Sequence, residues 1–179
     1  MAARRHFGTA AFLIGDVEMK FLADRMLGKL AKRLRMLGYD TVYYQGTDPE
    51  EMLQLARRGE RIILTRNARV VPGSPEDRIF GIGENLPSRQ LKELRQSRLL
   101  SFNPEKLFSR CLVCNAVLES IGSAEAEGKV PDFVFYHQKE FFRCPQCARI
   151  YWKGSHQENM RKWVEDFFRH PDEEMAPHC

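Results

Sequence analysis

The chain has 179 residues and a net charge of +4, with 43% hydrophobic and 29% charged residues. This size favours one domain with an appended module, and the composition allows a buried core. No apolar run approaches the ~20 residues that span a bilayer, so the sequence excludes the common helical membrane proteins and predicts no membrane partner.

Residues 1–18 are expected to be an N-terminal extension. Its apolar patch, AAFLI, is too short for the core of a signal peptide, and no clear small-residue cleavage site precedes the acidic GDVE. Met19 is a plausible alternative start. We therefore expect a cytoplasmic protein.

Strands and helices alternate along residues 19–98. Runs of β-branched and aromatic residues predict strands, whereas apolar residues at helical spacing predict helices. The predicted strands are residues 19–23, 40–44, 61–65 and 78–82, and the predicted helices are residues 26–37, 49–58 and 87–96. This order predicts an α/β fold built from parallel βαβ units with right-handed crossovers.

The helix at residues 49–58 has clear end signals. Asp48 is a suitable N-cap, Pro49 takes the first helical position and Gly59 follows the last turn. Glu51 stands three residues after the cap, which predicts a capping box.

The first predicted helix carries a basic face. Arg25, Lys29, Lys32 and Arg33 lie opposite its leucines, and Arg66 follows the third strand. A local basic face suits a polyanion such as RNA, although a solvated helix face is the simpler alternative.

Oxygen-bearing side chains follow each strand of the predicted sheet: Asp24, Asp48, Asn67 and Glu84. Ligands of open parallel sheets bind outside the carboxyl ends of the strands, so these side chains are expected to share one cleft. Clustered carboxylates hold Mg²⁺ or Mn²⁺ through oxygen atoms. The alternatives are local: caps for Asp24 and Asp48, a loop position for Glu84, and a turn cap for Asn67.

Two Cys-x-x-Cys pairs form the second module. Cys111, Cys114, Cys144 and Cys147 can converge tetrahedrally on one metal ion, and structural zinc is the favoured ligand. One alternative is that the thiols are unligated or redox-active. Another is iron, because rubredoxins pair cysteines similarly, and it would make the protein an electron carrier. Rubredoxins usually place Gly after each pair, whereas this chain has Asn115 and Ala148.

The last predicted helix follows the second cysteine pair. Ser155 and Glu158 predict a capping box, and an apolar stripe (Met160, Trp163, Val164 and Phe167) predicts packing. Trp152 and His156, which precede or begin this helix, are candidates for stacking on single-stranded RNA. The alternative is that Trp152 packs under the ribbon. Residues 169–179 are expected to be disordered, with Cys179 incidental.

Together these motifs resemble one known family, the PIN-like RNase domain with a C-terminal zinc ribbon (the Mut-seven C-terminal RNase domain family). The resemblance covers roughly residues 19–165 and is carried by FLADRMLGKLAKRLRMLGYDT, DPEEMLQLA, IILTRN, CLVC, CPQC and YWKGSH. It implies a PIN-like parallel sheet sandwiched by helices, acidic residues around a divalent metal, and RNA as the substrate.

Asn67 is where the chain departs from that family. Asp24 matches the first acidic position of the family and Asp48 the second, whereas the third, usually an Asp directly after Leu-Thr-Arg, is Asn67. A further Asp two residues later is replaced by Arg69. The amide keeps an oxygen ligand but removes one negative charge, so we expect weaker metal binding and retained RNA binding.

The leading interpretation is a metal-dependent ribonuclease. Asp24, Asp48 and Asn67 are its expected catalytic residues, with Mg²⁺ or Mn²⁺ as catalytic metal and a structural zinc ribbon that aids RNA binding. The alternative is a non-catalytic RNA-binding protein with a degenerate site. A homodimer is a further expectation, since PIN-type domains often dimerise.

The resulting domain division places the nuclease domain at residues 19–100 and the zinc ribbon with its helix at residues 108–168. Structural zinc contributes on the order of 10 kcal/mol to a small module. We therefore expect metal loss to unfold residues 108–155 and to leave the sheet domain folded.

Overall fold

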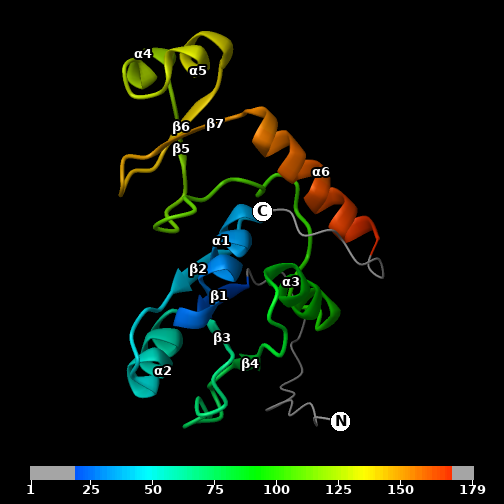
Figure 1. The fold of residues 1–179 in the computed structure, drawn as a ribbon. Helices are drawn as coiled ribbons and strands as arrows, with labels where there is room; N and C mark the ends of the chain where they lie inside the picture. Colours follow the sequence, from blue (N-terminus) through cyan, green and yellow to red (C-terminus); the bar gives the residue numbers. More distant parts are fainter. Residues whose placement is uncertain (1–18, 171–179) are drawn as a thin grey trace.

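The computed structural model describes residues 19–170, which form a parallel sheet flanked by helices and a small antiparallel sheet above it (Figure 1). This arrangement confirms the predicted α/β fold with an appended ribbon. No helix in the described range is both long and apolar enough to cross a bilayer. The expectations for residues 1–18, for residues 171–179 of the predicted tail and for Cys179 lie outside the described residues.

The parallel sheet contains all four predicted strands. They are β1 (Lys20–Ala23), β2 (Asp40–Tyr43), β3 (Ile62–Thr65) and β4 (Ile79–Gly81), in the order β2-β1-β3-β4. Every neighbouring pair is parallel. The central strands β1 and β3 are buried along almost their whole length, as expected for a parallel sheet covered on both faces.

Helices cover both faces of this sheet. They are the 3₁₀ turn η1 (Arg25–Leu27), α1 (Gly28–Met36), α2 (Pro49–Arg58) and α3 (Pro87–Gln96). Phe21 and Ala23 of β1 pack in the same cluster as α1 and α3, whereas Leu22 packs in the α2 cluster. The alternation follows from the two-residue period of a strand.

Of the two features predicted for the start of α2, the N-cap is confirmed and the capping box is not. The Asp48 Oδ1 atom accepts a 2.9 Å hydrogen bond from the Glu50 N–H, which makes Asp48 the N-cap. Glu51 does not complete the capping box in the predicted way. Its carboxylate instead accepts a 2.6 Å hydrogen bond from the hydroxyl of Tyr44, which competes for the same oxygen.

The ribbon is an antiparallel sheet of β5 (Glu119–Ile121), β6 (Phe141–Arg143) and β7 (Ile150–Trp152), in that order. Two short helices, α4 (Ser123–Ala126) and α5 (Asp132–His137), fill the connection between β5 and β6. Phe141 is buried beneath them, and Trp152 packs partly buried against the same cluster. The first cysteine pair precedes β5, and the second lies between β6 and β7.

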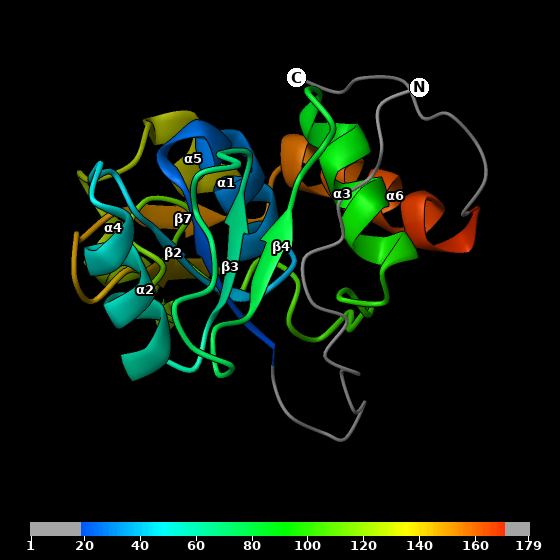
Figure 2. The same ribbon diagram turned by 90° about the horizontal axis from the view of Figure 1, so that it is seen from below.

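The final helix, α6 (Ser155–Arg169), returns from the ribbon to the first sheet and lies beside α3 (Figures 1 and 2). Trp163, Val164 and Phe167 join the core cluster of α1 and α3, which confirms their predicted packing role. The predicted capping box at Ser155 is wrong. Gly154 is the N-cap and makes no side-chain cap bond, because the helix already begins at Ser155.

Candidate functional site

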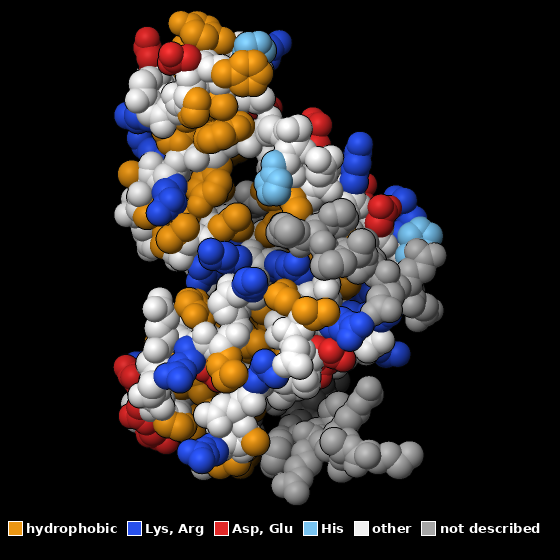
Figure 3. All heavy atoms as spheres, in the orientation of Figure 1, with side chains coloured by type: hydrophobic (Ala, Val, Ile, Leu, Met, Phe, Trp, Pro, Cys, Tyr) orange, Lys and Arg blue, Asp and Glu red, His pale blue; other side chains and the backbone are white. Residues whose placement is uncertain are grey.

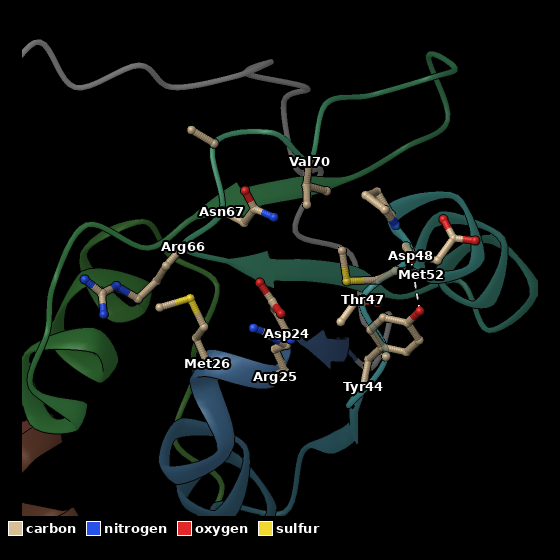
Figure 4. A pocket seen from close by; sticks show the side chains of 13 residues that line it. Asp24, Arg25, Met26, Tyr44, Thr47, Asp48, Met52, Arg66, Asn67 and Val70 are labelled. Atoms are coloured by element: carbon tan, nitrogen blue, oxygen red, sulfur yellow. Dashed lines mark hydrogen bonds between the residues drawn. The ribbon is translucent and has the colours of Figure 1, made fainter.

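A cleft of about 390 Å³ opens at the carboxyl ends of β1 and β3 (Figure 4). Its lining residues are Asp24, Arg25, Met26, Tyr44, Gly46, Thr47, Asp48, Pro49, Met52, Arg66, Asn67, Ala68 and Val70. The position agrees with the rule that parallel sheets bind ligands outside the carboxyl ends of their strands. The cleft thus brings together five of the predicted site residues: Asp24, Arg25, Asp48, Arg66 and Asn67.

Asp24 occupies the centre of the cleft. It directly follows β1, is only 7% exposed, and directs its carboxylate into the cleft (Figure 4). The Thr65 hydroxyl at the end of β3 donates a 2.6 Å hydrogen bond to Asp24 Oδ2, and its oxygen also accepts the N–H of Asn67 at 3.0 Å. Such a short bond to an ionised acceptor is a strong one. Thr65 therefore fixes the carboxylate of Asp24 relative to Asn67.

The sequence prediction did not include Thr65 among the site residues. Thr65 is 3% exposed and ends the otherwise apolar strand β3. A polar residue at the end of a buried strand is the local signal that marks it, since a buried hydroxyl requires a hydrogen-bond partner.

The side-chain amide of Asn67 is bonded to its own loop through the amide oxygen. Its Oδ1 atom accepts the N–H of Arg69 at 3.0 Å, which is the Asx-turn expected of Asn after a strand. Because that N–H can only donate, the amide oxygen must face it. The amide nitrogen therefore remains for the cleft (Figure 4).

Asp48 lies on the opposite wall of the cleft, at the start of α2, with its carboxylate turned away from Asp24 (Figure 4). Its Oδ1 atom is engaged as the helix cap. Glu84 is not among the residues that line the cleft; its N–H bonds to the carboxylate of Glu93. Within the described residues, the group of three or more acidic, His or Cys side chains close enough to share a metal ion is the cysteine cluster, and it contains none of these carboxylates.

Tyr44 is the buried phenol of the cleft. The carboxylate of Glu51 accepts a hydrogen bond from the Tyr44 hydroxyl, which raises the pKa of Tyr44 to about 12. Tyr44 therefore stays protonated at neutral pH, and Glu51 and the backbone oxygen of Asp48 share the hydrogen bond from its single O–H.

Exposed basic side chains lie on η1 and α1, and of these Arg25 lines the cleft. Arg25, Lys29 and Lys32 are exposed, and Lys and Arg side chains gather over α1 beside the hollow between ribbon and sheet (Figure 3). Arg33 departs from the predicted solvent-facing set, because its guanidinium stacks over the ring of Trp163 at 5.3 Å. Arg66 lines the cleft, but its guanidinium extends away from Asp24 to the side chain of Asn85 (Figure 4).

Trp152 and His156 do not line the cleft. Trp152 is partly buried and packs against the ribbon cluster around Phe141, so the packing alternative describes it. His156 is exposed on the first turn of α6. The structure thus places neither of these two candidates in the cleft.

The four cysteines converge. Their sulfur atoms lie within 4.8 Å of one another, with Cys111 and Cys147 at 3.6 Å and Cys114 and Cys144 at 3.2 Å. The N–H groups of Cys114 and Cys147 point at the sulfurs of Cys111 and Cys144, at 3.5 and 3.4 Å. Thiolates at these spacings fit a tetrahedral metal ion such as zinc.

The pKa values of the thiols differ within the cluster. Burial opposes ionisation of Cys111, but hydrogen bonds from the Tyr151 hydroxyl and from backbone N–H groups lower its pKa to about 6. Burial and the neighbouring sulfurs raise the pKa of Cys114 to about 12. A full set of thiolates so close together requires a positive ion to balance its charge.

One family of known proteins matches this architecture. The family model described as the Mut7-C RNAse domain matches residues 19–164, a range that contains the cleft, both cysteine pairs and most of α6. A comparison with curated proteins found no match.

Proposed function

Because the chain belongs to the Mut7-C RNAse domain family, we propose that it is a metal-dependent ribonuclease that cleaves RNA phosphodiester bonds at the Asp24 cleft. The observation that carries this proposal is the buried carboxylate of Asp24, fixed by Thr65 at the carboxyl end of β1. Thr65 engages Oδ2, which leaves Oδ1 for a hard cation such as Mg²⁺ or Mn²⁺.

Phosphate binding and water positioning are assigned to the groups around Asp24. A divalent cation bound at Asp24 would neutralise phosphate charge and provide a more acidic water. The amide nitrogen of Asn67 donates to a phosphate oxygen or positions a water molecule, since its oxygen is engaged with Arg69. Asp48 caps α2 through Oδ1 with its carboxylate turned away from Asp24, so a role at the ion would require its Oδ2 to turn toward Asp24.

The exposed face of α1 provides the RNA-binding surface. Arg25 lies on η1 just before this helix, and Lys29 and Lys32 lie one turn apart on α1; together they attract the phosphate backbone toward the cleft. Two methionines of the lining, Met26 and Met52, offer apolar surface for a ribose or base. Zinc at the four cysteines serves a structural role in the ribbon.

One observation favours a second candidate, a non-catalytic RNA-binding protein. Asn67 stands where the family pattern usually has a carboxylate, and Asp48 is exposed and committed to a helix cap. Fewer carboxylates weaken the attraction for a divalent cation. In that case the basic face would bind RNA and the cleft would not turn it over.

RNA cleavage by matched carboxylate variants separates the two candidates. Single-stranded RNA is incubated with Mn²⁺ and with wild type, Asp24→Asn or Glu84→Gln, the last being a carboxylate outside the cleft. The nuclease proposal expects cleavage by wild type and by Glu84→Gln and none by Asp24→Asn. Binding of RNA by all variants without cleavage would favour the second candidate, and equal cleavage by all would place the activity elsewhere.

A further inference from the structure

Asn115 and Ala148 occupy equivalent positions in the two cysteine pairs. Each directly follows its pair and has a positive φ, of 74° and 58°. The N–H of Asn115 bonds to the carbonyl of Cys111, and that of Ala148 to the carbonyl of Cys144, both at 3.0 Å. Both turns therefore require the same positive-φ backbone conformation, which glycine adopts with the least strain.

Their side chains differ, because Asn115 reaches the parallel sheet. Its Oδ1 atom accepts the backbone N–H of Thr41 at 2.9 Å, and its Nδ2 atom donates to Asp40 at 2.6 Å. Asp40 is held in turn by Arg61 at 2.7 Å. Since β2 lies at the edge of the sheet, the amide of Asn115 takes the place of a neighbouring strand.

Arg35 makes a second connection to the same strand residue. It is 5% exposed, and its Nε atom donates to the carbonyl of Thr41 at 2.9 Å. Its Nη1 atom donates to the carbonyls of Leu112 and Val113, between the first two cysteines, at 3.0 and 2.8 Å. Thr41 is therefore linked to the metal-binding turn directly through its N–H and, by way of Arg35, through its carbonyl.

The charge of Arg35 also suits this place. Burial lowers the pKa of Arg35, but the thiolates of Cys111 and Cys114 act in the opposite direction. A divalent ion with several thiolates carries net negative charge, and a guanidinium remains positive at any physiological pH. Arg35 thus brings a positive charge from the sheet domain next to the cysteine cluster.

We propose that Asn115 and Arg35 couple metal binding at the four cysteines to the edge of the cleft-bearing sheet. A metal ion that fixes residues 111–115 also fixes Thr41, and β2 leads directly into the cleft wall at Tyr44–Asp48. The expectation that metal loss spares the sheet domain is replaced by loosening of β2. This coupling does not depend on whether the cleft cleaves RNA.

Amide exchange of Thr41 in the zinc-loaded full chain tests the coupling. Asn115→Gly preserves the turn and removes both side-chain bonds, whereas Ala148→Gly makes the same change in the turn without contacts to the sheet. We expect Asn115→Gly to increase the exchange rate of Thr41 about tenfold and to accelerate zinc transfer to a chelator by a similar factor. Ala148→Gly should increase neither the exchange rate of Thr41 nor the rate of zinc transfer.

Zinc removal from the wild type is the second measurement. It should increase Thr41 exchange at least to the rate in Asn115→Gly, and this measurement remains decisive if the variant folds poorly. Equal Thr41 exchange in the two glycine variants, or Thr41 exchange that zinc removal leaves unchanged, overturns the proposal. Neither readout involves RNA, so a failure here is distinct from a failure of the proposed nuclease.

Discussion

The side chain of Asn67 joins the loop to the cleft through opposite ends of one amide. Its oxygen accepts the N–H of Arg69, so an aspartate at this position would keep that bond with one oxygen. The second carboxylate oxygen would then replace the amide nitrogen that faces Asp24. The turn-cap interpretation and the site interpretation of Asn67 are therefore compatible.

Asn67→Asp should raise the affinity for Mn²⁺ by about tenfold, because the cleft gains an anionic oxygen beside Asp24. Two nearby carboxylates should also slightly destabilise the metal-free protein. Mn²⁺ titration followed by electron paramagnetic resonance measures the affinity. The control is Asn103→Asp, since Asn103 makes the same turn with the N–H of Glu105 outside the cleft. Equal affinities in the two variants would contradict this role for Asn67.

Asp77 fixes the loop that carries Asn67. It accepts hydrogen bonds from Arg57 at 2.7 and 2.8 Å and from the N–H groups of Gly73 and Ser74 at 2.9 Å. The Arg57 guanidinium, followed by these N–H groups, holds the pKa of Asp77 below its usual value. A lowered pKa in the folded state stabilises the protein above the unfolded pKa of about 4, and this stability disappears as the pH falls.

Asp77→Asn should therefore lower the free energy of unfolding at pH 7 by about 1–2 kcal/mol, as expected for lost bonds to a charged group. The difference from wild type should shrink as the pH falls below about 4. Urea unfolding at pH 7 and at pH 3 measures both values. Glu76→Gln, an exposed neighbour, should show no such pH dependence. A difference that persists unchanged at pH 3 would refute the assignment.

At the scale of elements, α6 connects the ribbon to the first sheet. Its apolar stripe packs with α1 and α3, and the guanidinium groups of Arg33 and Arg95 lie over the rings of Trp163 and Phe167 at 5.3 and 4.3 Å. The helix thus shares a core with the sheet, although a long ribbon precedes it in sequence. We expect α6 and the sheet to unfold together.

Trp163→Ala should cost about 3–5 kcal/mol, because Trp163 is only 4% exposed and its removal leaves a cavity between α6 and α1. Lys162→Ala, on the exposed side of the same helix, should change stability by less than about 0.5 kcal/mol. Denaturant unfolding followed by circular dichroism makes the comparison. A loss confined to α6, with the sheet transition unchanged, would show that the helix is energetically separate.

Local patterns in the sequence were sufficient for the strands, the N-cap at Asp48 and the cysteine pairs. These features depend on residues a few positions apart, whose geometry fixes the outcome. Thr65, Arg35 and Asn115 were missed as functional or joining residues because their partners lie on other elements. The predicted capping box at Ser155 is wrong for a related reason, because the residue at which α6 begins depends on how the chain leaves β7.

For the whole molecule, the basic face of α1 is the proposed RNA-binding surface. Lys and Arg side chains gather over this helix and border the hollow between ribbon and sheet (Figure 3). Lys29 and Lys32 are exposed there, so they can reach phosphates without first breaking buried contacts. The mild net charge of +4 makes this local distribution the relevant quantity.

RNA affinity should fall steeply with salt, because each neutralised phosphate releases counterions. Charge reversal by Lys29→Glu with Lys32→Glu should weaken binding and reduce the salt slope by roughly 0.7 for each lost contact. Fluorescence anisotropy at several salt concentrations measures both. Lys139→Glu, on the ribbon, is the matched control. A salt-independent affinity, or an equal effect of the control, would remove α1 from the RNA-binding surface.

The location of the divalent ion tests the central claim most directly. Mn²⁺ added below stoichiometry to the ¹⁵N-labelled, zinc-loaded chain broadens the amide signals nearest to its binding site. The account predicts the strongest broadening at Asp24 and Asn67, its loss in Asp24→Asn, and its retention in Glu84→Gln. Broadening centred on Glu84, or broadening near Asp24 that persists in Asp24→Asn, would contradict the assignment of this cleft as the metal-dependent centre.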